Sequence, residues 1–282
     1  MSLAIFTETV LRRDRTVVLV GLGTIVVLSW AYLGYLAWGM AGMMTMEMGD
    51  TGMAMNMATD VATNVGMEMA MPAIQPWGAV DYWLMFVMWA VMMFAMMTPS
   101  AAPMVLTYTK ISRRQAGTLQ PVWGTAVFFF GYLLIWTLFS AAATLAQGGL
   151  HAATLLSPMM ETTSPVLGGI ILVAAGVFQF TALKQACLSH CRTPLGYFMT
   201  EWREGKWGAL AMGVRHGAFC VGCCWLIMAL LFVAGVMNLF WIAIIAAYVL
   251  LEKVLPHGHK VSWAFGALMM GWGIWMIAGV LL

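Results

Sequence analysis

The chain is built from long apolar runs separated by short polar stretches. Runs of about twenty apolar residues recur along its 282 residues, and about twenty are needed for a helix to cross a bilayer. The runs are continuous and do not alternate between apolar and polar positions, so they predict membrane helices and argue against a β-barrel. We predict seven spans, at 17–39, 79–105, 122–146, 165–186, 212–236, 239–255 and 261–281.

The basic residues lie in alternate segments between these runs. With the N-terminus inside, all thirteen lysines and arginines fall in inner segments and none in outer ones. Loops rich in Lys and Arg are retained in the cytoplasm. The charges therefore predict an all-α, polytopic transmembrane helical bundle with the N-terminus inside and the C-terminus outside. Five spans is the alternative, in which 239–255 and one neighbouring run are re-entrant.

Composition agrees with a membrane protein and divides the chain into three parts. Hydrophobic residues make up 62% and charged residues 9% of the chain, against about 25% charged in soluble domains. Residues 1–39 form a cytoplasmic lead and a first helix that we expect to be retained, because its apolar run is too long for a signal peptide. Residues 40–76 form an external loop, and residues 77–282 form a six-helix membrane domain.

Residues 40–71 have a composition found nowhere else in the chain. Eleven methionines fall within these 32 residues, together with four acidic residues and no basic ones. Thioether sulfur is a soft, neutral ligand suited to Cu(I), so the segment predicts capture of a soft metal outside the cell. The alternative interpretation is an adaptable apolar filler or lid. The methionines at alternating spacing are Met44, Met46, Met48, Met53, Met55, Met57, Met67, Met69 and Met71.

The second span places further methionines on one helical face. Spacings of three, four and four residues share a face at about 100° per residue. Pro99 and Pro103 follow and should bend the helix. The face either packs in the core or offers intermediate sites to a passing metal ion. Its members are Met85, Met88, Met92 and Met96.

All five cysteines lie in two short stretches, and each stretch also contains a histidine. If helices continue through 187–191 and 216–224, the members of each stretch share one face. The predicted orientation places both stretches at the cytoplasmic side of the fourth and fifth spans. The candidate metal ligands are Cys187, His190, Cys191, His216, Cys220, Cys223 and Cys224.

Five thiols and two imidazoles at one depth favour a soft or borderline metal. The cytosol is reducing, so permanent disulfides are disfavoured. Cu(I) selects soft sulfur ligands, whereas Zn(II) takes four ligands from Cys and His. There are more candidate ligands than either Cu(I) or Zn(II) requires, so some of them are structural or belong to a transfer relay. The Cys220–Cys223 spacing also permits thiol exchange. In the alternative interpretation the cysteines are small buried hydrophobes and the histidines cap helix ends or meet lipid headgroups.

Three motifs carry a family resemblance. They are MMTPSAAPM at 96–104, LKQACLSHCR at 183–192, and GVRHG with CVGCCW between 213 and 225. Over about residues 80–255 the chain resembles a bacterial family of predicted metal-binding integral membrane proteins, a domain of unknown function. The resemblance implies a metal at the seven cysteines and histidines above and a place in the bacterial inner membrane. It leaves the metal and the activity open.

Copper handling is the function that these features favour together. The external loop would capture Cu(I), the methionine face would offer weak sites in passage, and the inner thiols would receive or store the ion. Asp81 and Glu252 are the only carboxylates of note within spans, and no nucleotide motif occurs. Passive transfer, or service to a partner metalloenzyme, therefore fits better than pumping.

Two other hypotheses remain open at this point. One is a membrane oxidoreductase, or an accessory subunit of a membrane metalloenzyme complex, with a metal–thiolate centre or a reactive cysteine pair. The other is a non-catalytic assembly subunit with structural zinc. The expected partners are the lipid bilayer and either a membrane metalloenzyme complex or a copper chaperone, and no nucleic acid.

Overall fold

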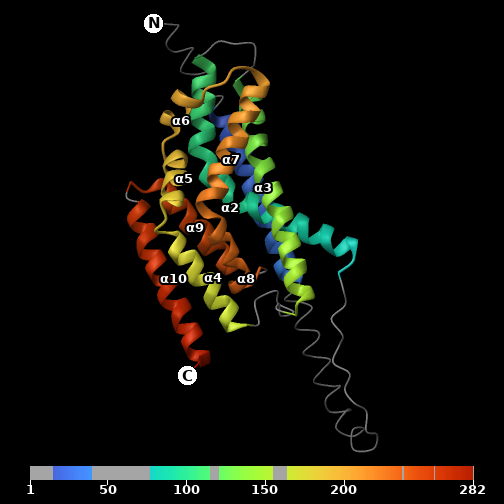
Figure 1. Cartoon of the computed structure of the whole chain (residues 1–282). Coiled ribbons are helices and arrows are strands. Elements are labelled where there is room, and N and C mark those ends of the chain that lie inside the picture. The colour runs from blue at the N-terminus through green and yellow to red at the C-terminus, as the bar shows by residue number, and fades with distance from the viewer. Residues whose placement is uncertain are drawn as a thin grey trace, which may run out of the picture.

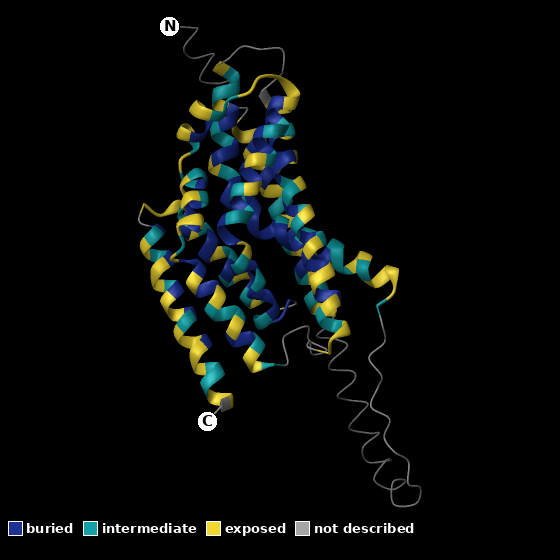
Figure 2. Ribbon diagram, viewed as in Figure 1, coloured by how far each residue is buried: buried dark blue, intermediate teal, exposed yellow. Residues whose placement is uncertain are grey.

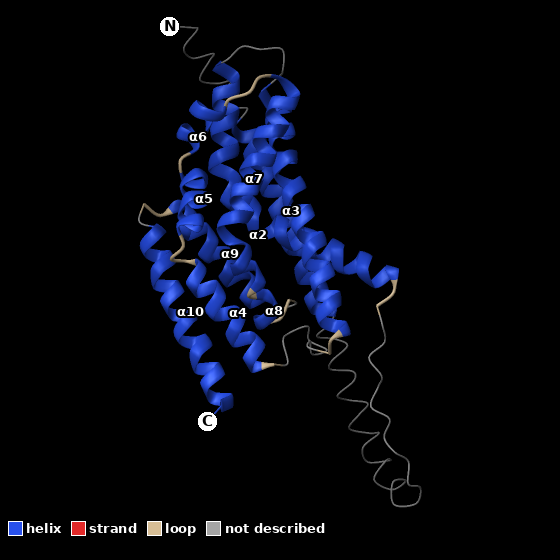
Figure 3. Ribbon diagram, in the orientation of Figure 1, coloured by secondary structure: helices blue, strands red, loops and turns tan. Residues whose placement is uncertain are grey.

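The computed structural model describes residues 15–39, 77–114, 121–154, 164–236, 238–256 and 258–281. Every regular element in these ranges is a helix and none is a strand, which confirms the all-α prediction (Figure 3). The first helix is Arg15–Gly39. The later helices are α2 (Ala79–Arg114), α3 (Pro121–Ala152), α4 (Pro165–Phe178), α5 (Ala182–Arg192), α6 (Pro194–Glu201), α7 (Gly205–Ala229), α8 (Leu231–Ala234), α9 (Leu239–Val254) and α10 (Gly258–Leu281).

Five of these segments are long and apolar enough to cross a membrane. They are the first helix, α2, α3, α7 together with α8, and α10. The bent pair of α4 and α5 makes a sixth crossing if it counts as one span. With 16 residues, α9 is shorter than a typical transmembrane helix. The multi-pass helical class agrees with the sequence prediction, while seven spans and their orientation stay predictions.

The fourth predicted span, 165–186, is not one continuous helix. In the structure α4 ends at Phe178, α5 begins at Ala182, and the two helices are bent by 65°. The Thr181 side chain caps α5 by accepting a hydrogen bond from the Lys184 backbone N–H at 3.3 Å. A polar cap therefore starts a new helix where the apolar pattern alone predicts continuation.

Pro99 and Pro103 both lie inside α2, a helix of 36 residues that neither proline ends. In Figure 1 the first turns of α2 run sideways at the right edge and its last turns run upright, so the predicted change of direction is present. Between the two prolines, the Ser100 hydroxyl donates to the Met97 carbonyl oxygen at 2.9 Å. A proline is tolerated within a membrane helix where neighbouring helices cover the carbonyl that it leaves without a donor.

Glycines bring the backbones of α3 and α7 into direct contact. A Cβ added to Gly213 on α7 would lie 1.9 Å from the Phe128 carbonyl oxygen on α3. A Cβ added to Gly131 on α3 would lie 2.6 Å from the Leu210 carbonyl oxygen on α7. Small residues allow this close approach in membrane bundles. The contact fixes α7 beside Tyr132 of α3, a residue of the site described below.

The outer surface of the described helices is rich in large apolar side chains (Figure 2). Trp38, Trp83, Trp207 and Trp275 are between 63% and 82% exposed. Such an extensive apolar surface is unusual for a water-soluble monomer and marks a membrane or protein contact. Along one edge, α10 packs closely against α4, while α3 packs most extensively against α7 (Figure 1).

Candidate metal site

Four of the candidate ligands lie together on α7, and all four are buried. Cys220, Cys223 and Cys224 are 0% exposed and His216 is 2% exposed. The Cys223 and Cys224 thiols donate to the Cys220 carbonyl oxygen at 3.1 and 3.0 Å. The three thiols therefore lie in one region of the helix. This is expected, because Cys223 and Cys224 follow Cys220 by three and four residues, the separations that place side chains on the same helical face.

A fourth buried thiol comes from α5, which packs against α7. The Cys191 side chain is buried close to the Cys220 and Cys223 side chains of α7. We call Cys191, Cys220, Cys223 and Cys224 the thiol group. Two stretches that are far apart in sequence thus meet in space through Cys191.

The other two candidates on α5 lie at the edge of this group. Cys187 is half-buried, and a Cβ added to Gly222 would lie 3.0 Å from its sulfur, so the glycine makes room for it. His190 is half-buried and stacks on Phe219 with ring centroids 4.2 Å apart. Its Nδ1 lies 2.8 Å from the Ala186 carbonyl oxygen, which requires Nδ1 to be the protonated nitrogen. The contacts of Cys187 with Gly222, and of His190 with Phe219 and the Ala186 carbonyl, are enough to explain the positions of these two side chains without a metal ion.

Two polar groups from other helices contact the Cys220 sulfur, and a third contacts one of these two. The Lys253 ammonium of α9 donates to the Cys220 sulfur at 2.9 Å and to the Ser100 hydroxyl of α2 at 3.1 Å. The Tyr132 hydroxyl of α3 lies 3.2 Å from the same sulfur and 3.2 Å from the Met97 carbonyl oxygen. Four helices therefore supply the immediate environment of one thiol.

A second buried polar network lies beside the thiol group. Its centre is an ion pair between the Lys184 ammonium of α5 and Glu252 of α9, 2.6 Å apart and fully buried. The Tyr248 hydroxyl lies 3.1 Å from the same carboxylate oxygen, and the Ser262 hydroxyl donates to it as well. Gln179, at the bend between α4 and α5, accepts a hydrogen bond from Lys184. The network ties the bend to α9 and α10.

The sequence pattern does not mark Lys253, Tyr132 or Ser100 as parts of the site. A signal for the lysine was present, because an ionisable residue next to an apolar run is costly in lipid and usually faces a partner inside the protein. Nothing in the sequence linked Lys253 to Cys220 across 33 positions. Tyr132 lies in an aromatic run that is typical of ordinary packing.

His216 is held in place by aromatic rings. Its ring stacks on Tyr132 with centroids 5.4 Å apart and on Phe128 with centroids 6.1 Å apart. Among the described residues its Nδ1 has no hydrogen-bond partner. A buried nitrogen without a partner is unusual, so His216 retains a free donor or acceptor close to the thiol group.

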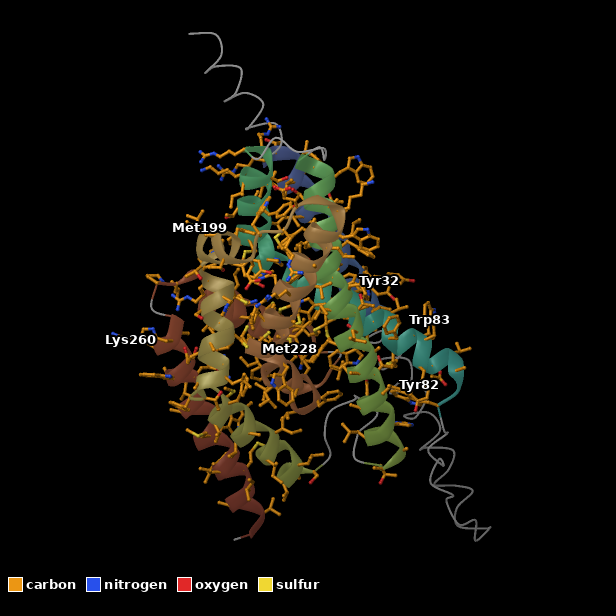
Figure 4. All side chains as sticks on the ribbon, turned by 45° about the horizontal axis from the view of Figure 1, so that its top comes forward. Tyr32, Tyr82, Trp83, Met199, Met228 and Lys260 are labelled. Carbon is orange, nitrogen blue, oxygen red and sulfur yellow. The ribbon has the colours of Figure 1, made fainter. Side chains whose placement is uncertain are left out.

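The methionine face of α2 lies in the protein core. Met88, Met92 and Met96 are at most 3% exposed, and Met85 is half-buried. In Figure 4 the labelled Met228 of α7 also lies in the interior of the bundle. Packing in the core is enough to explain these buried methionines. The passage of a metal ion along them stays a prediction. The methionines of 40–71 lie outside the described residues.

A buried tyrosine fastens the short helix α6 to α7. The Tyr197 hydroxyl donates to the Met212 carbonyl oxygen at 2.7 Å. Burial raises the pKa of this hydroxyl, and the nearby Glu201 carboxylate raises it further. Tyr197 therefore remains a neutral donor throughout the physiological pH range.

The donor set of the thiol group suits a soft metal. All five cysteines are free of disulfides. Within the described ranges, no three or more His, Cys, Asp or Glu side chains are grouped to hold a metal ion. Sulfur ligands select Cu(I), which needs only about two of them, so two thiols of this group would suffice for a Cu(I) site. The thiol group contains no hard oxygen ligand.

The fold and the site define a helical, membrane-type protein with a buried, soft-donor thiol group. The model of the PpoB2 family, described as a copper chaperone, matches residues 86–276, and the chain belongs to this family. No curated protein and no solved structure matches the chain. The resemblance to a metal-binding membrane family is thus confirmed in part, since the matched family is described by copper rather than by an unknown function.

Proposed function

We propose that this protein is a Cu(I) chaperone of the bacterial inner membrane that binds its cargo at the thiol group. The observation that carries the proposal is the meeting of Cys191 with Cys220 and Cys223, which brings soft donors from two helices to one buried place. Membership of a family described as a copper chaperone supports copper as the cargo. In this proposal seven spans cross the membrane, with the N-terminus and the thiol group on the cytoplasmic side.

The methionines serve the same cargo in this proposal. The 40–71 segment captures Cu(I) outside, because thioethers bind it without losing a proton. Met85, Met88, Met92 and Met96 offer weaker sites between the two faces, and weak sites permit the ion to leave each one. The recipient is a copper enzyme or another copper carrier, and passive transfer accounts for the absence of a nucleotide-binding motif from the sequence.

The decisive experiment compares single cysteine variants of the full chain purified in detergent. Cu(I) affinity is measured by competition with a chromophoric Cu(I) chelator. We expect Cys191→Ser and Cys220→Ser each to lower the affinity at least about tenfold, because each removes a sulfur ligand. Cys187→Ser is the matched control, since its sulfur lies at the edge of the group, and should change the affinity less than about threefold.

The same preparation separates the other hypotheses. Equal losses in Cys187→Ser and Cys220→Ser would contradict a site centred on the thiol group. Stoichiometric zinc that copper does not displace would favour the assembly subunit. A redox-active optical or paramagnetic spectrum would favour the oxidoreductase or its accessory subunit.

A further inference from the structure

Lys253 is a buried cation whose ammonium contacts a cysteine sulfur. Its side chain is 8% exposed, and its ammonium donates to the Cys220 sulfur and the Ser100 hydroxyl at 2.9 and 3.1 Å. A buried charge is costly unless a partner compensates it. The identity of that partner therefore bears on what the site is built to hold.

No carboxylate neutralises Lys253 among the described residues. The neighbouring acid on α9, Glu252, directs one oxygen to Lys184 at 2.6 Å and receives hydrogen bonds from Tyr248 and Ser262 on that oxygen. One buried acid is thus matched by one lysine. The second lysine, Lys253, is left with the thiol group as its source of negative charge.

The charge of a copper–thiolate unit fits this arrangement. When Cu(I) binds two thiols, two S–Cu bonds form, two S–H protons leave to solvent, and no electron is transferred. One positive ion and two thiolates leave a net charge of minus one. A single fixed ammonium beside the sulfurs brings the buried total to zero. A divalent ion on the same two thiolates would bring it to plus one.

We infer that Lys253 is the charge-balancing residue of the copper site and makes it selective for a monovalent ion. This inference rests on the proposed function. Lys253 is a positioning residue: it does not ligate the metal but donates an N–H hydrogen bond to the Cys220 sulfur that does. Hydrogen bonds to ligand sulfurs and burial are known means by which a protein tunes its metal.

The test compares two metals in the full chain. Cu(I) and Zn(II) affinities are measured separately by chelator competition for the native protein, Lys253→Met and Lys253→Arg. We expect Lys253→Met to lower the Cu(I) affinity at least about tenfold and to leave the Zn(II) affinity unchanged or raised, because the neutral side chain no longer balances an anionic copper unit. Lys253→Arg keeps the charge and should retain the Cu(I) preference within about threefold.

The control is Lys260→Met, which makes the same change at an exposed lysine on α10 (Figure 4) and should alter neither affinity. If Lys253→Met does not fold, Lys253→Gln replaces it with the same expectation. Equal losses of both metals, or no change in their ratio, would overturn the inference while leaving a copper site that depends on Cys191 and Cys220. A native protein without such a site would overturn the proposed function and this inference with it.

Discussion

At the residue scale, Cys220 is the point on which the contacts of the site converge. Its sulfur contacts Lys253 and Tyr132, and its carbonyl accepts the thiols of Cys223 and Cys224. The four buried thiols are therefore not equivalent. Cys220 has the most polar surroundings, which makes it the first sulfur to test in any metal-binding experiment.

Spacing along one helix predicted which α7 side chains share a face, because helical geometry fixes neighbours at three and four residues. The contact of Lys253 with Cys220 could not be predicted in this way. It depends on how α9 packs against α7 and α2, and no local pattern in the sequence encodes that packing. The same holds for Tyr132, whose role follows from the approach of α3 to α7.

Gly213 allows a first prediction, because its hydrogen faces the α3 backbone. Gly213→Ala should destabilise the protein by about 1–3 kcal/mol or more, since the added methyl meets the Phe128 carbonyl oxygen and only backbone movement relieves the clash. Gly271→Ala on α10 is the matched control. Nothing lies within 4 Å of its added methyl, and it should stabilise the helix by about 0.5–1 kcal/mol.

Thermal unfolding in detergent measures both glycine variants. The geometry of α3 and α7 would be contradicted if Gly213→Ala unfolded at or above the temperature of the native protein. Because Gly213 lies on α7, which carries three of the four cysteines of the thiol group, the same variant should also weaken Cu(I) binding, whereas the α10 control should not.

At the element scale, the bend between α4 and α5 is the feature that the apolar pattern of the sequence did not predict. No proline or glycine marks residues 179–181, so the apolar pattern predicted one helix. The cap by Thr181 and the polar contacts of Gln179 decide the local structure instead. By contrast, the long runs of α2, α3 and α10 were predictable, since a strong apolar pattern outweighs details of capping.

The ion pair of Lys184 with Glu252 leads to a prediction about how α5 and α9 are joined. Lys184→Met should cost about 3–5 kcal/mol, because it leaves the Glu252 charge buried without its partner. The double variant Lys184→Met with Glu252→Leu should recover much of that loss, because no unpaired charge remains.

A double-mutant cycle in thermal or denaturant unfolding gives the coupling between these two positions. Losses that simply add would show that the pair does not join the helices. Lys206→Met is a suitable control, since Lys206 is an exposed lysine at the start of α7, and it should leave stability within about 0.5 kcal/mol of the native value.

At the scale of the whole molecule, the proposal divides copper handling between capture and holding. The segment 40–71 carries thioethers, and the membrane domain carries thiols. Replacing the nine alternating methionines of the segment by leucine removes the sulfurs and preserves apolar character. We expect less copper to accumulate in copper-fed cells, with the Cu(I) affinity of the purified thiol group unchanged.

Cellular copper measured by mass spectrometry, together with chelator competition on the purified protein, checks this division. Unchanged cellular copper at equal protein abundance would favour the interpretation of the segment as apolar filler. The control is Cys220→Ser. It keeps the methionines of 40–71 intact and weakens the thiol group, so it should have the opposite effect.

The adjacency of Glu252 and Lys253 has a consequence for biogenesis. In the seven-span arrangement proposed above, α9 is short and carries two charged residues in its last turn, and a lone helix of this kind enters lipid poorly. Their partners, Lys184 and Cys220, lie earlier in the chain and leave the ribosome first. The translation order thus presents α9 with its charge partners before it must leave the translocon, so its insertion is expected to depend on α5 and α7 already being in place.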